Sequence, residues 1–107
     1  MITTIKKRDG REIHFSPEKI TRAIFLAASR VAEEDGVKAD YETAEILTDK
    51  VVNLLNNKYQ DTTPSVEDIQ DAVVKVLIET GQAETSEAYI LYRAERTRIR
   101  SMKTRLM

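Results

Sequence analysis

The sequence predicts a mainly α-helical α+β domain in which an N-terminal β-hairpin packs on a small four-helix bundle. Two observations lead to this fold class. An Asp-Gly turn lies between two short β-prone runs near the N-terminus, and four segments with helical apolar spacing follow it. With 107 residues, the chain is long enough for one domain of this kind and too short for two.

The hairpin is expected in residues 2–15, which carry the strongest local turn signal of the chain. Asp9-Gly10 can fill both positive-φ positions of a two-residue type I′ turn, and this turn would pair Ile5 with His14. In that register, apolar side chains and lysines are mixed on both faces. Because an isolated hairpin is marginally stable in water, we expect it to lie against the helices, with cations pointing in or past it.

Four helices are expected after the hairpin. Their boundaries follow from Ser16-Pro17, Asp40 and Ser65 at the starts, and from Gly36, Gly81 and a polar loop at the ends. The expected ranges are 17–35, 41–55, 66–80 and 85–107, with a loop at 56–64. The residues expected to face the core recur at helical spacing: Ile20, Ala23, Ile24, Ala27, Val31, Tyr41, Ala44, Leu47, Val51, Leu54, Leu55, Ile69, Val73, Val76, Leu77, Ala88, Leu91, Tyr92, Ile99, Met102 and Leu106.

Composition excludes several kinds of site. The chain has no cysteine and one histidine, so disulfides, thiolate metal sites and multi-histidine clusters are excluded. No apolar run approaches the ~20 residues of a membrane span, and no Gly-rich phosphate loop of the P-loop type occurs. An enzyme active site confined to this chain is therefore not expected.

Charge is segregated along the chain although the net charge is only −1. Residues 1–30 carry seven basic and three acidic residues. Residues 31–92 carry four basic and fourteen acidic residues, and residues 93–107 carry six basic residues and one acidic residue. If the fold brings the two basic ends together, an anion is the natural guest between them. Alternatively, the basic residues of the last helix only solvate a face and favour the C-terminal end of the helix dipole.

Basic residues also gather near the expected start of the first helix. Lys6, Lys7 and Arg8 approach the turn, Lys19 lies one turn into the helix, and the last helix carries Arg93 three residues before Arg96. Phosphate groups prefer this combination of long cationic donors and unpaired N–H groups at a helix start.

Three separated motifs, in the same order, resemble the ATP-cone domain. They are IKKRDGR at residues 5–11 with FSPEKI at 15–20, SVEDIQDAV at 65–73, and AYILYR at 88–93. The resemblance covers about residues 2–96. The basic tail at residues 93–107 is most similar to the stretch that leads into the catalytic part of anaerobic (class III) ribonucleotide reductases.

This resemblance implies an allosteric domain, not itself an enzyme, that binds ATP or dATP with Mg²⁺ beneath the hairpin, which acts as a lid. ATP would keep a ribonucleotide reductase active, and dATP would shut it down through oligomerisation; the parent would be the anaerobic ribonucleoside-triphosphate reductase. Residues 1–100 would form the regulatory domain, and 101–107 would begin a linker to a catalytic domain. The implied partners are that domain and further copies of the chain, in the cytoplasm and away from membranes.

The resemblance also implies the residues of the site. Phosphate contacts fall to Lys7, Arg8, Lys19, Arg93 and Arg96, and the nucleoside pocket to Ile5, Phe15 and Ile20. Gln70 stands where some members of the family have a histidine, so base contacts do not carry over.

Two other functions stay open. A nucleotide-sensing domain of a transcriptional regulator would need a cysteine zinc ribbon to read DNA, and the acidic middle of the chain would repel nucleic acid. A helical oligomerisation module without any ligand is the other alternative.

Overall fold

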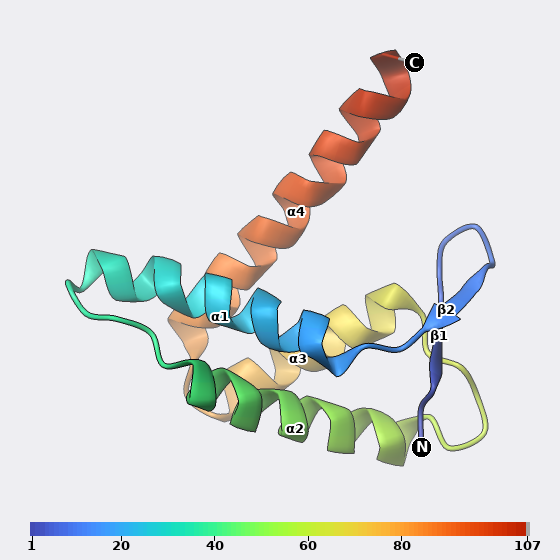
Figure 1. Cartoon of the computed structure of the whole chain (residues 1–107), viewed down its shortest axis with the longest axis horizontal. Coiled ribbons are helices and arrows are strands. Elements are labelled where there is room, and N and C mark those ends of the chain that lie inside the picture. Colours follow the sequence, from blue (N-terminus) through green and yellow to red (C-terminus); the bar gives the residue numbers. More distant parts are fainter. Residues whose placement is uncertain (107) are drawn as a thin grey trace.

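The computed structural model describes residues 1–106 and consists of a two-stranded antiparallel sheet followed by four helices (Figure 1). The elements are β1 (Thr4–Lys6), β2 (Glu12–His14), α1 (Pro17–Glu34), α2 (Tyr41–Lys58), α3 (Val66–Glu79) and α4 (Ala83–Leu106). The predicted fold class is confirmed. The final residue of the expected linker, Met107, lies outside the described residues. Within the described part, none of the helices has the length and apolarity to cross a bilayer.

The register of the hairpin differs from the prediction by one residue. Ile5 pairs with Ile13, not with His14, and the loop has three residues. The Gly10 N–H donates to the Lys7 carbonyl at 2.9 Å, and Gly10 has φ +87°. This is a type I turn followed by a left-handed glycine. The predicted type I′ turn was wrong because it needs Asp9 at positive φ as well, which costs a non-glycine residue about 1–2 kcal/mol.

The corrected register sorts the side chains of the hairpin onto two different faces. A shift of one residue moves every side chain of one strand to the opposite face. Ile5 and Ile13 now lie on one face with Phe15, which is buried, while His14 and Lys6 on the other face are exposed. Lys7 shares the face of Ile5, so the expected mixture of apolar and cationic side chains is still present on that face.

The helix ends follow the capping signals closely, with two corrections. Asp40 caps α2, and Ser65 and Asp68 form a reciprocal capping box at the start of α3. The loop predicted for residues 56–64 is shorter, because α2 runs on to Lys58. α4 begins at Ala83, two residues earlier than predicted, directly after the turn that ends α3.

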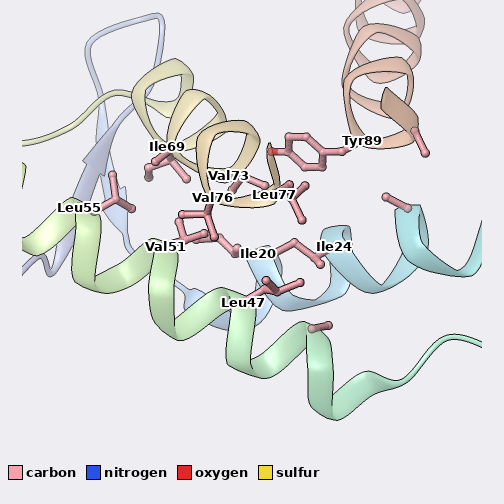
Figure 2. Packing of buried hydrophobic residues seen from close by; sticks show 14 of the residues in the cluster. Ile20, Ile24, Leu47, Val51, Leu55, Ile69, Val73, Val76, Leu77 and Tyr89 are labelled. Carbon is pink, nitrogen blue, oxygen red and sulfur yellow. The ribbon is translucent and has the colours of Figure 1, made fainter. Parts of the chain in front are cut away.

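The core lies between α1, α2 and α3, with the first turns of α4 closing one side (Figure 2). α1 packs on α2 and α4, and α3 packs on the same two helices. Ile24, Val51 and Leu77 are fully buried. The ring of Tyr89 reaches from α4 towards α3 in the same layer (Figure 2).

α4 leaves the bundle after its first turns and extends alone (Figure 1). Ala88 and Tyr89 are buried, but Leu91, Ile99 and Met102 are 50–60% exposed. The predicted core stripe of the last helix is therefore wrong at Leu91, Ile99 and Met102, because the helix projects away from the bundle (Figure 1). The side chain of Leu106, also predicted in the core, lies outside the described residues. Tyr41, also predicted in the core, is 44% exposed and packs edge-on against Phe25.

The hairpin is attached to the start of α3. The Lys6 N–H donates to the Pro64 carbonyl at 2.9 Å, and Lys6 forms a parallel bridge with Ser65. At the N-terminus, the Ile2 N–H donates to the Asn56 side chain at 2.9 Å. These contacts hold the hairpin in place, and its tip lies on the same side of the bundle as the distal part of α4 (Figure 1).

Candidate functional site

A cleft of about 460 Å³ lies between α1, α4 and the start of α3. Its volume falls in the range of roughly 300–1,000 Å³ that is typical of small-molecule sites. It is lined by Lys19, Arg22, Ala23, Leu26, Val66, Gln70, Tyr89, Tyr92, Arg93, Arg96 and Thr97.

The lining of this cleft is strongly cationic. Lys19 and Arg22 lie three residues apart on α1, and Arg93 and Arg96 lie three residues apart on α4. Because residues at this spacing share one face of a helix, each helix presents two positive side chains to the cleft. None of the residues that line it is acidic. An anion that enters the cleft is therefore met by positive charge from both helices.

Two tyrosines of α4 form the aromatic part of the wall. Tyr89 is buried, and this burial raises the pKa of its hydroxyl to about 12, so the group is a neutral hydrogen-bond donor at neutral pH. The Arg96 guanidinium lies 5.8 Å from the centre of the Tyr92 ring, and its Nη1 donates to the Tyr92 hydroxyl at 3.2 Å. The cleft thus offers flat apolar surface beside its cations, which suits a ligand with a ring and a charged group.

Two carboxylates of α3 stand at the rim of the cleft. Glu67 follows the lining residue Val66 and accepts from Arg8 Nε at 2.7 Å. Asp71 follows the lining residue Gln70, and its Oδ1 lies 3.6 Å from Arg93 Nη1. The hydrogen bond from Arg8 holds the pKa of Glu67 below its ordinary value.

The structure brings together three of the eight residues expected in the site. Lys19, Arg93 and Arg96 line the cleft. Arg8 reaches its rim from the hairpin loop through its ion pair with Glu67. These residues come from the hairpin, from α1 and from α4, and α4 is far from the other two in the sequence.

The other four expected residues do not line the cleft. Phe15 and Ile20 are each 7% exposed and belong to the core, and Ile5 packs against that core. Lys7 is half-buried on the face of the hairpin that carries Ile5. Their expected roles in the nucleoside pocket and at the phosphates stay predictions.

Several lining residues were missed by the sequence reasoning. Arg22 carried a signal, since it lies three residues after Lys19 and must share its helical face. Tyr92 was expected in the core instead, and Tyr89 was not singled out. Their positions depend on the angle at which α4 leaves the bundle, and no local pattern in the sequence encodes that angle.

A second cavity, between α2 and α3, is much smaller. It measures about 110 Å³ and mixes two lysines with Asp68 and Asp71. The cavity has too little room for a nucleotide, and its balanced charge gives no preference for an anion.

Comparison with known proteins gives a family match and several relatives. Residues 3–98 match the ATP-cone family, described as the ATP cone domain. The chain is 43% identical over 108 residues to a vitamin B12-dependent ribonucleoside-diphosphate reductase of Thermoplasma acidophilum, an alignment that covers 96% of this chain and 13% of that protein.

Similar matches come from two chlamydial proteins. The ribonucleoside-diphosphate reductase subunit alpha of Chlamydia muridarum is 34% identical over 101 residues, covering 91% of this chain and 10% of that protein. The protein of the same name from Chlamydia pneumoniae is 33% identical over 104 residues, covering 95% of this chain and 10% of that protein. The chain thus spans about a tenth of the length of these relatives.

Proposed function

The chain belongs to the ATP-cone domain family, and we propose that it binds ATP or dATP as an allosteric effector in the cleft between α1 and α4. The observation that carries this proposal is the lining of the cleft, with four cations from two helices and no carboxylate. A triphosphate with a charge of about −4 cannot be left unpaired in a partly enclosed site, so it selects such a cluster of donors.

The ligand would lie with its phosphates between the paired cations and its base against the tyrosines. Lys19 and Arg22 would bind phosphate oxygens from α1, and Arg93 would bind them from α4. Arginine suits this role because its planar group can donate two parallel hydrogen bonds to one phosphate. Tyr92 supplies aromatic surface for the base next to these donors.

The hairpin would act as the lid of the site. Its loop already reaches the rim through Arg8, and Lys7 directly precedes this loop. Mg²⁺ would accompany the triphosphate and be held mainly by its phosphate oxygens, as is usual for this ion.

The parent protein is proposed to be a ribonucleotide reductase whose overall activity this domain controls. Support comes from the relatives, which are named as ribonucleoside-diphosphate reductases and of which this chain matches only a small part. The anaerobic, triphosphate-reducing class suggested by the basic tail stays a prediction, as does the cytoplasmic location. Residues 101–107 would begin the connection to the catalytic domain.

The output of the domain is proposed to be a change in oligomeric state. ATP and dATP differ by one 2′-hydroxyl, and one hydrogen bond contributes about 1 kcal/mol. Moving a two-state equilibrium from 1:99 to 99:1 needs about 5.5 kcal/mol of differential binding. Several domains acting together in an oligomer would supply what a single hydroxyl does not. Sedimentation of the full-length protein with each nucleotide tests this: a change of size with dATP supports the proposal, and one unchanged size contradicts it.

Titration calorimetry with dATP and ATP tests the binding proposal directly. We expect saturable binding that Arg22→Ala weakens by at least tenfold. Lys50→Ala removes a cation that is also exposed but lies on α2, away from the cleft, and should leave the affinity within about twofold of wild type. Absence of heat with either nucleotide, or equal losses in the two variants, would contradict the proposed site.

A further inference from the structure

Several positive side chains lie close together in and beside the cleft. The cleft is lined by four cations, and Arg8 stands at its rim. Like charges at this spacing repel one another, and the repulsion destabilises the compact state. The two carboxylates on α3 relieve this repulsion.

Glu67 and Asp71 each bind an arginine from a different part of the chain. Glu67 Oε1 accepts from Arg8 Nε at 2.7 Å, and Asp71 Oδ1 lies 3.6 Å from Arg93 Nη1. The two carboxylates are four residues apart and therefore share one edge of α3. Arg8 lies in the hairpin loop and Arg93 lies on α4, so this edge connects the lid and the last helix to α3.

Glu67 responds to both arginines. Its pKa is lowered first by the hydrogen bond from Arg8, and the positive charges of Arg8 and Arg93 lower it further. The carboxylate therefore binds a cation of the hairpin and also feels the charge of a cation of α4. A phosphate that recruits the same two arginines would make the same kind of charge-assisted contact.

We propose that Glu67 and Asp71 are placeholder anions, which neutralise cations of the site in the free domain and give them up to phosphate groups when a polyphosphate binds. The proposal deepens the proposed function and rests on it, since it takes the ligand of the cleft to be a polyphosphate. Both pairs can exchange, because the Arg8 and Asp71 side chains are 75% and 74% exposed. Exposed ion pairs are weak and break readily.

If this exchange occurs, removing the charge of a placeholder should raise the affinity for polyphosphate and lower the stability of the free domain. Removing the charge of a placeholder frees its arginine and takes a negative charge away from the phosphates, so polyphosphate binding becomes tighter. The same change leaves the cations of the free domain less neutralised, so the free domain melts at a lower temperature. If the carboxylate only supported the fold, its removal would instead lower both the melting temperature and the affinity.

The test compares Glu67→Gln with Glu79→Gln. Glu79 lies on the same helix and pairs with Lys75 at 4.0 Å, away from the cleft, so its substitution removes an equal charge. Affinities for dATP and for inorganic tripolyphosphate are measured by calorimetry, and melting of the free domains by circular dichroism. We expect Glu67→Gln to bind both ligands about three- to tenfold more tightly and to melt a few degrees lower, and Glu79→Gln to keep its affinities within about 1.5-fold.

A second variant, Asp71→Asn, should tighten binding about twofold, because its ion pair is longer. Unchanged or weaker binding in both Glu67→Gln and Asp71→Asn, with the wild type binding dATP, would overturn the placeholder role and leave the proposed function standing. Tighter binding of tripolyphosphate by Glu67→Gln, with no binding of dATP or ATP by any variant, would support the placeholder role and contradict the proposed function. Failure of every variant to bind either ligand would overturn both.

Discussion

Replacing Arg93 by glutamine removes one positive charge from the α4 side of the cleft while keeping a side chain of similar reach. The Arg93 side chain is 30% exposed and lies beside the buried Tyr89. A hydrogen bond to a charged group contributes about 1.5–3 kcal/mol, and partial exposure favours the lower part of that range. We therefore expect the affinity for dATP to fall about 10- to 30-fold, which corresponds to about 1.5–2 kcal/mol.

The same variant should change the stability of the free domain little. Its lost ion pair with Asp71 is surface-exposed and contributes less than about 1 kcal/mol, so the melting temperature should fall by less than about 5 °C. Calorimetric titration with dATP measures the loss of affinity, and Arg98→Gln on the exposed part of α4 is the matched control. Equal affinities of Arg93→Gln and the wild type, or an equal loss in Arg98→Gln, would refute the role given to Arg93.

Three further predictions concern the fold and the site. Leu77→Ala should cost about 3 kcal/mol in thermal unfolding because Leu77 is fully buried, whereas Ile78→Ala, at 58% exposure, should cost less than about 0.5 kcal/mol; similar losses would contradict the packing. The Ser65 N–H donates to the Asp68 carboxylate and lowers its pKa, so the contribution of Asp68 to stability is complete above the ordinary pKa of 3.8 and is lost as the pH falls below that value. In Asp68→Asn, the free energy of unfolding should therefore depend less steeply on pH below 3.8. An unchanged slope would argue against this contact. Lys19→Ala and Lys7→Ala should each weaken dATP binding at least tenfold, as measured by calorimetry, and should retain the helix content measured by circular dichroism. Wild-type affinity in Lys7→Ala would show that Lys7 does not contact the phosphates.

Local signals in the sequence predicted most of the fold. Capping residues such as Asp40 and Ser65 act within one turn of their own helix, so their effect can be read without tertiary information. The hairpin register could not be read in the same way, because the Asp-Gly pair fits two kinds of turn. The choice between them depends on which register places Ile5 and Phe15 against the helices.

The site was only partly predictable for a related reason. Lys19 and Arg93 could be singled out as candidate phosphate ligands from their charge and their motifs, and the structure places both in one cleft. The carboxylate partners of Arg8 and Arg93 could not be found, because an ion pair between residues so far apart in sequence depends on how the hairpin and α4 meet α3. Acidic residues near a helix start are also usual as capping residues, which hides any second role.

We propose that cations of the hairpin, α1 and α4 bind one polyphosphate together. The most direct measurement is an NMR titration of the domain with dATP that follows the Nε–H signals of Arg8, Arg22 and Arg93. We expect the three signals to shift along one common binding curve, while the signals of α2 do not shift. Separate curves for the three arginines, or shifts confined to α2, would contradict it.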